Sequence, residues 1–510
     1  MPSGPSDSPR RVVDADFTVL ALDQSADAAL VVGSQAGAEH VEVHVTRVRH
    51  GEIELRDSHL EGTSDTTVLG LSVRVVKDGV WGFAAGDGVT ADSARALAER
   101  ALAMAELSRP MAVQRVVLAP EPWHGVHEWV SSYEIDPFDV PSDERIALLR
   151  DQSAQLLADS RVQHVDTAAS YVKEQKFYAD SVGTRTTQQR LRIQAEWEAV
   201  SIDDFSGEFE SMRTCAPPVG RGWEYLHDGQ WNWSEELSQL PELLYEKLRA
   251  PSIEPGRYDL VIDPTNLWLT IHESVGHATE LDRALGYEAN YAGTSFATLD
   301  LLGSLQYGSS LMHVTGDRVA PHGLSTVGFD DEGVAAQEWD LIRDGILVGY
   351  QVDRATAGVA ELPRSNGCAF ADGPHSAPIQ RMPNVSLQPD PLGPDTAGLI
   401  AGVEDGIYLV GDNSWSIDMA RYNFQFTAQR FYRIKSGRLA GQVRDVAYQS
   451  RTPDFWRSLV ALGGPATYLL AGANNCGKAQ PEQAAPVSHG APTAVFAHVN
   501  VLNTRGEAGR

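Results

Sequence analysis

Cysteine is scarce in this sequence, and its few cysteines do not form an obvious set of pairs. The 510 residues contain three, Cys215, Cys368 and Cys476. An odd and widely spaced set fits a reducing compartment better than a disulfide framework. The sequence also has no C-x-x-C pair, which argues against zinc knuckles and against a nucleobase-deaminase site.

Long apolar runs are absent as well. No run approaches the roughly 18 apolar residues that a membrane span requires. The first 15 residues predict a disordered tail. Two arginines at positions 10 and 11 resemble a twin-arginine signal, but three aspartates between residues 14 and 23 interrupt the apolar stretch that a signal peptide needs. We therefore expect a cytoplasmic protein that does not associate with membranes.

Positive charge is in deficit. The chain has 41 lysines and arginines against 69 aspartates and glutamates, a formal net charge of -28 at pH 7, and no compensating basic block. This balance argues against nucleic acid as a direct partner. With 42% hydrophobic and 22% charged residues, the composition is that of an ordinary globular protein, and the length suggests two or three domains.

A histidine-glutamate motif stands out in the second half of the chain. His272-Glu273 and a second histidine, His277, lie within an apolar segment that predicts a helix over residues 267–282. Imidazoles can hold a zinc ion, and a carboxylate between them can take a proton from the water that attacks a peptide carbonyl. The alternative interpretation is a buried helix with two hydrogen-bonded histidines.

The spacing of this motif departs from the common metalloprotease pattern. The sequence reads H-E-x-x-x-H, whereas the familiar pattern is H-E-x-x-H. On an ideal α-helix, five residues advance the second histidine by roughly 140° beyond a full turn, so the two rings would not share a face. We therefore predict a π-type widening between His272 and His277, for which Gly276 is a plausible position.

A catalytic zinc normally has three protein ligands, so a third must be found. The candidates are Glu280, Asp282, His313 and Cys476. Glu280 is well spaced for ligation, but a carboxylate that orients a ligand is an equal possibility. Cys476 lies in a polar, glycine-containing segment that we expect to be a loop, where a lone cysteine is by default an ordinary thiol. From the residues alone, these alternatives stay open.

The remaining pattern predicts an α+β fold in two parts, with mixed and antiparallel sheets, flanking helices and the metal-site helix in the C-terminal half. We expect a boundary near residues 245–255, which gives an N-terminal α+β domain over 16–250 and a C-terminal domain over 251–510. The expected elements are hairpins over 41–56 (turning at 50–51), 71–83 and 171–198, helices over 92–104, 143–157 and 231–250, and a strand over 258–262.

Two further clusters of ligand-type residues have simpler explanations. Asp330-Asp331-Glu332-Gly333 is the densest acidic run of the second half; support of an active site is one interpretation, but we favour a glycine-terminated turn. His124, His127 and Glu128 have ligand-like spacing in a stretch that resembles a loop, and we interpret them as a chance surface cluster.

Four motifs, in this order, resemble the TldD/PmbA (TldD/TldE) metallopeptidase family, and the likeness covers nearly the whole chain. They are the run from His272 to His277, Asp330-Asp331-Glu332-Gly333 followed by Leu341 to Leu347, Ser365-Asn366-Gly367, and Cys476-Gly477-Lys478. The resemblance implies a Zn²⁺ ion held by His272, His277 and Cys476, with Glu273 as the general base. Because both histidines, the glutamate and the cysteine are present, the chain resembles the catalytic TldD-type subunit.

The resemblance also implies an assembly and a substrate. Members of the family form dimers, commonly with a TldE-like subunit that lacks the metal motif, so a homodimer or such a heterodimer is expected. The active site would face an internal cavity that admits unfolded or short peptides, for peptide maturation or degradation. The alternatives are a zinc hydrolase of a non-peptide amide, and a non-catalytic interaction protein, because the family has also been labelled a modulator of DNA gyrase.

Overall fold

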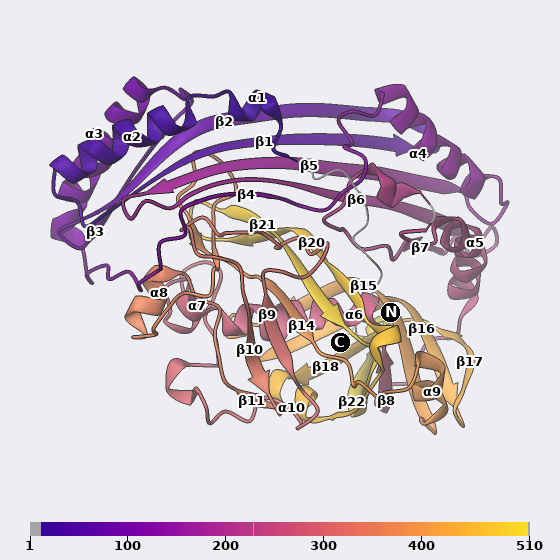
Figure 1. The fold of residues 1–510 in the computed structure, drawn as a ribbon. Coiled ribbons are helices and arrows are strands. Elements are labelled where there is room, and N and C mark those ends of the chain that lie inside the picture. Colours follow the sequence, from indigo (N-terminus) through magenta and orange to yellow (C-terminus); the bar gives the residue numbers. More distant parts are fainter. Residues whose placement is uncertain (1–11, 228, 508–510) are drawn as a thin grey trace, which may run out of the picture.

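A long, curved sheet arches over the rest of the molecule in the computed structural model, which describes residues 12–227 and 229–507 (Figure 1). In spatial order its strands are β3 (Val80–Gly86), β2 (His59–Lys77), β1 (His40–Arg56), β5 (His164–Asp180), β6 (Arg185–Ile202) and β4 (Val126–Val130), and β7 (Phe209–Arg213) pairs with β6. All neighbours are antiparallel except β4 and β6.

Helices cover the outer face of this sheet at its two ends. They are α2 (Leu22–Gln35) and α3 (Ala91–Ser108) at one end and α4 (Ser142–Leu157) and α5 (Trp233–Arg249) at the other, and the short α1 (Ala15–Thr18) lies nearer the middle (Figure 1). Two 3-10 turns, η1 (Arg109–Met111) and η2 (Trp223–Leu226), belong to the same half. Successive residues of a strand point to opposite faces. Thus Val43 packs under α2 and α3 and Trp197 under α4 and α5.

Buried ion pairs join the inner, polar face of the sheet to the C-terminal half. Lys176 of β5 donates to Asp331 at 2.6 Å, and Arg74 of β2 donates to Glu332 at 2.7 Å. Both carboxylates belong to a turn that Gly333 closes in the left-handed region, with φ of 72°. The predicted glycine-terminated turn is confirmed, and its acidic side chains serve the contact between the two halves.

One predicted turn is wrong. His50-Gly51 does not end a strand, because β1 runs unbroken from His40 to Arg56. Gly51 is required by packing: a Cβ there would lie 2.1 Å from the Tyr171 ring on the neighbouring strand. The other two predicted hairpins are confirmed as β2–β3 and β5–β6, and the three predicted helices of this half as α3, α4 and α5.

The C-terminal half is built on a closed barrel. The strands β15 (Asp405–Ile417), β8 (Gly256–Ile262), β22 (Ala494–Asn503), β18 (Val446–Arg451) and β16 (Asn423–Lys435) pair in this order, and β16 pairs back with β15. Two further strands, β17 (Arg438–Val443) and β19 (Leu459–Leu462), extend the sheet beside β16 and β22. The fold is thus α+β, as predicted.

Smaller sheets and short helices surround the barrel. A four-stranded sheet contains β11 (Ile346–Leu347), β10 (Glu338–Arg343), β9 (Val314–Asp317) and β14 (Asn384–Leu387), and two hairpins are β12 (Ala369–Phe370) with β13 (Ile379–Gln380) and β20 (Leu469–Lys478) with β21 (Gln483–Ala491). The helices are α6 (Pro264–Ile271), α7 (Leu281–Ala284), α8 (Arg354–Val359), α9 (Thr396–Ala401), α10 (Thr452–Arg457) and α11 (Thr504–Glu507), with 3-10 turns η5 (Leu299–Leu301) and η6 (Pro465–Thr467).

Three further expectations concern the N-terminal tail, the domain boundary and membrane-spanning helices. Most of the tail predicted over residues 1–15 lies outside the described residues, which begin at Val12. Within the described part, α5 ends at Arg249 and β8 begins at Gly256, so a boundary in this interval remains our proposal. None of the helices in residues 12–227 and 229–507 has the length and apolar composition needed to cross a membrane.

Candidate metal centre

Helix α6 lies in the core and leads directly into the histidine motif. Asp263 caps its first turn by accepting from the Thr265 backbone N–H at 3.0 Å, and Pro264 occupies the first helical position, where no N–H is needed. All eight residues of the helix are buried, and it packs against β15, β20 and β21. The helix therefore ends inside the protein, at Ile271, directly before His272.

The turn after α6 is a π-helix. The segment η3 spans His272–Gly276, and the His277 backbone N–H donates to the His272 carbonyl, five residues back. The predicted π-type widening is confirmed. A Cβ on Gly276 would lie 2.5 Å from the Met382 sulfur, and the residue has an ordinary helical φ of -51°, so close packing is what requires glycine here.

The helix does not continue to residue 282 as predicted. A 3-10 turn, η4 (His277–Thr279), follows the π-helix, and Glu280 is extended, with φ of -70° and ψ of 118°. Glu280 leaves the helix because it forms a bridge with Gln351 and its carboxylate turns back to His277. Helix α7 then starts at Leu281.

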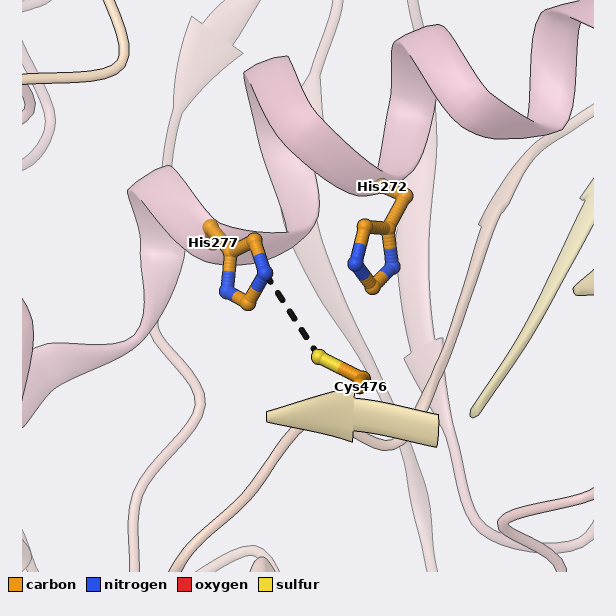
Figure 2. Close-up of side chains that lie close together, drawn as sticks. All are labelled: His272, His277 and Cys476. Atoms are coloured by element: carbon orange, nitrogen blue, oxygen red, sulfur yellow. Dashed lines mark hydrogen bonds between the residues drawn. The ribbon is translucent and has the colours of Figure 1, made fainter. Parts of the chain in front are cut away.

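His272, His277 and Cys476 converge from two elements far apart in the sequence. Figure 2 shows both imidazoles projecting from the helix toward Cys476 on β20. The expected loop is wrong here, because Cys476 pairs with Ala485 of β21. One potential ligand atom from each of the three side chains lies within 4.8 Å of the others, and the Cys476 Sγ is 3.5 Å from His277 Nε2. Among the described residues, no other group of histidine, cysteine or carboxylate side chains meets this criterion.

The other candidates for the third ligand have different partners. Glu280 bonds to His277 Nδ1 at 2.8 Å, Asp282 accepts from Lys478 at 2.8 Å, and His313 pairs with Asp340 at 2.9 Å. Of the four candidates, only Cys476 belongs to the convergent group.

The carboxylate of Glu280 fixes the orientation of His277. A carboxylate only accepts, so His277 Nδ1 carries the proton and Nε2 keeps its lone pair toward Cys476. Glu280 is itself held by Arg283 at 3.1 Å and by Lys478 at 3.0 Å. Because residues two apart on a strand share a face, Lys478 and Cys476 both face this group.

A third histidine, His489 of β21, fixes His272 in the same way. Its Nδ1 lies 3.0 Å from the Val385 carbonyl, which can only accept, so Nδ1 carries the proton and Nε2 is an acceptor. His272 Nδ1, at 2.8 Å, must therefore donate, which leaves Nε2 of His272 free as a ligand. Trp268 stacks on His489, with ring centroids 6.2 Å apart. Nothing in the sequence spacing pointed to His489.

Burial sets the protonation of the three convergent side chains. It lowers the pKa of His272 to about 4 and that of His277 well below its ordinary value, so both are neutral at pH 7. Burial also raises the pKa of the Cys476 thiol above its ordinary value. The two imidazoles are thus ready to ligate, whereas the thiol must lose a proton on binding a metal.

Glu273 lies beside the convergent group and is not a member of it. Its Oε2 accepts from a guanidinium N–H of Arg421 at 2.5 Å, and its side chain is 8% exposed. Arg421 lies in the loop between β15 and β16, a position that the sequence reasoning did not single out. Glu273 is therefore a largely buried, paired carboxylate next to the candidate ligand His272.

His124, His127 and Glu128 do not belong to the convergent group found among the described residues. His124 pairs with Glu121 at 2.7 Å, His127 with the His124 carbonyl at 2.6 Å, and Glu128 with the Val13 N–H at 3.3 Å. The interpretation as a chance cluster agrees with these separate partners. The expected loop is partly wrong, because residues 126–130 form β4.

Comparisons with known proteins give a family. The PmbA/TldA metallopeptidase C-terminal domain matches residues 255–503, and the PmbA/TldA metallopeptidase domain 1 matches residues 41–105. A metalloprotease of Archaeoglobus fulgidus is 31% identical over 365 residues, which is 70% of this chain and 77% of the relative. A metalloprotease of Methanothermobacter thermautotrophicus is 27% identical over 471 residues, 91% of this chain and 94% of the relative.

Other similarities are partial or structural. A zinc metalloprotease TldD homolog of Saccharolobus solfataricus is 24% identical over 220 residues, 43% of this chain and 46% of the relative. A Thermotoga maritima protein described as a modulator of DNA gyrase has a TM-score of 0.72 and 16% identity, covering 94% of this chain and all of its own. TldE of Thermococcus kodakarensis has a TM-score of 0.70 and 16% identity, covering 94% and 99%. These two structures show a common fold, and the sequence matches show that the chain belongs to the TldD/PmbA metallopeptidase family.

Proposed function

We propose that this chain is the catalytic, TldD-type subunit of a zinc-dependent peptidase that cleaves unfolded or short peptides. The observation that carries the proposal is the convergence of His272, His277 and Cys476, whose potential ligand atoms lie within 4.8 Å of one another. Two imidazoles and one thiolate form a borderline-soft donor set that suits zinc, and three protein ligands leave the fourth position of a catalytic site for water.

The surroundings of the three side chains support metal binding. Glu280 and His489 each accept a hydrogen bond from the protonated Nδ1 of a proposed histidine ligand. This bond directs the other ring nitrogen into the site. Such outer partners are typical of histidines that hold a metal. A zinc ion bound there would act as a Lewis acid toward a peptide carbonyl and would lower the pKa of a bound water.

Glu273 is the proposed general base. As the water oxygen attacks the carbonyl carbon of the scissile amide, the Glu273 carboxylate takes a proton from that water. When the C–N bond breaks, the same carboxyl returns the proton to the departing amine nitrogen. Its pair with Arg421 at 2.5 Å holds the carboxylate in place beside the ligands.

We further propose that the chain works in the cytoplasm within a dimer whose internal cavity admits the peptide, either with a second copy or with a TldE-like subunit. The structural similarity to TldE of T. kodakarensis supports a partner of that fold. The net charge of -28 supports the absence of nucleic acid as a partner. Peptide maturation and degradation both remain suitable roles for such an enzyme.

A cleavage assay tests the function and separates it from its alternatives. The purified chain, alone and with a TldE-like subunit, is incubated with unfolded casein before chelation, after chelation and after zinc is restored. We expect cleavage that chelation abolishes and zinc restores. Zinc-loaded protein that cleaves simple amides but no peptide would favour the non-peptide hydrolase, and zinc-independent binding without cleavage would favour the interaction protein.

A further inference from the structure

The loop between β15 and β16 holds an arginine in an unusual backbone conformation. Arg421 has φ of 61°, in the left-handed region that few non-glycine residues occupy. The Asp418 carboxylate closes the loop by accepting from the N–H groups of Ala420 at 3.1 Å, Tyr422 at 2.8 Å and Asn423 at 3.0 Å. Such outliers persist where the surrounding structure fixes them, and they concentrate at functional sites.

Neighbouring segments fix the same loop from outside. The Met419 carbonyl accepts from the Thr294 N–H at 2.7 Å, and the Arg421 carbonyl accepts from the Thr452 hydroxyl at 2.7 Å. The direction in which the Arg421 side chain leaves the backbone is therefore set before any substrate binds.

The guanidinium of Arg421 is only partly used by the protein. One terminal N–H donates to Glu273 at 2.5 Å and another to the Ala292 carbonyl at 3.0 Å. The Nε is buried and has no hydrogen-bond partner, and the side chain is 12% exposed. Because a guanidinium carries five N–H donors, several remain available at the edge of the site.

The positive charge of Arg421 also lies beside the segment that carries the candidate ligands. Its partner Glu273, at 2.5 Å, directly follows His272 in η3. The carbonyl of a peptide that is attacked by a water activated by Glu273 would therefore come close to this guanidinium.

We propose that Arg421 is a catalytic residue that donates a hydrogen bond to the carbonyl oxygen of the scissile amide as that oxygen becomes negative. This inference rests on the proposed peptidase function. When the water oxygen bonds to the carbonyl carbon, the π electron pair moves to the carbonyl oxygen, and Arg421 stabilises the resulting charge while Glu273 holds the water's proton. The pair returns as the C–N bond breaks and the proton passes to the amine.

A positioning role through Glu273 is the alternative, and a binding experiment separates the two. The probe is an acetylated tetra-alanine peptide whose central amide is replaced by a phosphinate, which carries the charge of the transition state. The reference ligand is the same peptide with its amide intact. Both are measured on zinc-loaded Glu273→Gln protein, which removes the carboxylate, with and without Arg421→Met.

We expect Arg421→Met to weaken phosphinate binding in the Glu273→Gln background by about 10²–10³-fold, the usual effect of one oxyanion donor. Amide binding should change less than about threefold, and zinc content should stay at one per chain. If phosphinate affinity changes no more than amide affinity, Arg421 acts only through Glu273 and the proposal is wrong. Arg438→Met, at an exposed arginine of the same half, is the matched control.

A second variant and the wild-type protein complete the test. Should Arg421→Met lose its zinc or its fold, Arg421→Lys takes its place, and a loss of phosphinate affinity below about tenfold with amide affinity unchanged would contradict the proposal. If zinc-loaded wild type neither binds the phosphinate nor cleaves casein, the peptidase function fails with it. Cleavage by wild type together with unchanged phosphinate binding by both Arg421 variants would overturn the role of Arg421 alone.

Discussion

Replacing Glu280 by glutamine tests how the metal site is held together. Glu280 is fully buried and meets His277 at 2.8 Å, Lys478 at 3.0 Å and Arg283 at 3.1 Å. Burial alone would raise the pKa of this carboxyl, but Lys478, Arg283 and His277 together hold it well below its ordinary value. The amide keeps the size of the side chain and removes its charge.

Glu280→Gln should have two effects, one on the stability of the metal-free protein and one on its affinity for zinc. Breaking a buried ion pair costs about 3–5 kcal/mol, and we expect the lower value because Asp282 still faces Lys478 at 2.8 Å. At roughly 2–4 °C per kcal/mol for a domain of this size, metal-free protein should unfold about 6–12 °C lower than wild type. Loss of an outer partner of a metal-binding histidine should also weaken zinc binding by about 10–100-fold.

Both effects are measurable on the same protein. Thermal unfolding in chelator gives the first, and competition with a chelator of known affinity gives the second. Glu482→Gln, an exposed carboxylate in the turn between β20 and β21, is the control and should change neither. Wild-type zinc affinity in the Glu280→Gln protein would refute the idea that this carboxylate orients His277.

The remaining predictions concern proton transfer and ligation. Glu273→Gln should keep one zinc per chain and lose about 10²–10⁴ in the rate of peptide hydrolysis, measured with zinc-loaded protein; turnover within a few-fold of wild type would exclude Glu273 as the base. Cys476→Ser should lose most of the metal, as metal analysis would show, and wild-type zinc content would make Glu280 the next candidate. Zinc binding at pH 7.5 should release one proton per zinc, because the pKa of His272 is about 4 and that of His277 is also lowered by burial, whereas burial keeps Cys476 a thiol. Apparent zinc affinity should therefore rise about tenfold per pH unit above pH 7, and calorimetry in several buffers that finds two or more protons released would contradict this protonation scheme.

Helix geometry made the π-turn predictable from the sequence. Five residues cannot bring His272 and His277 to one face of a regular α-helix, and the observed His277 N–H bond to the His272 carbonyl is the correction that geometry demands. The break at Glu280 was not predictable in this way, because it depends on Gln351 and on the side-chain bond to His277.

The spacing of residues in the sequence could not identify site residues that lie far from the histidine motif along the chain. Cys476 was one of four open candidates until the family resemblance favoured it, since its approach to His277 depends on how β20 packs against the helix. His489 and Arg421 were missed, because one lies on a strand and the other in a loop whose positions follow from the tertiary fold. Gly51 led to a wrong prediction, because glycine is needed there for close contact with Tyr171 and not for a turn.

X-ray absorption at the zinc edge, on zinc-loaded wild-type protein, tests the proposed site most directly. We predict one sulfur ligand at about 2.3 Å, two imidazole nitrogens at about 2.0–2.1 Å and one light atom from solvent. The sulfur signal should disappear in any zinc retained by Cys476→Ser. A wild-type spectrum without sulfur, or with three imidazoles as if His489 were a ligand, would contradict the assignment of His272, His277 and Cys476.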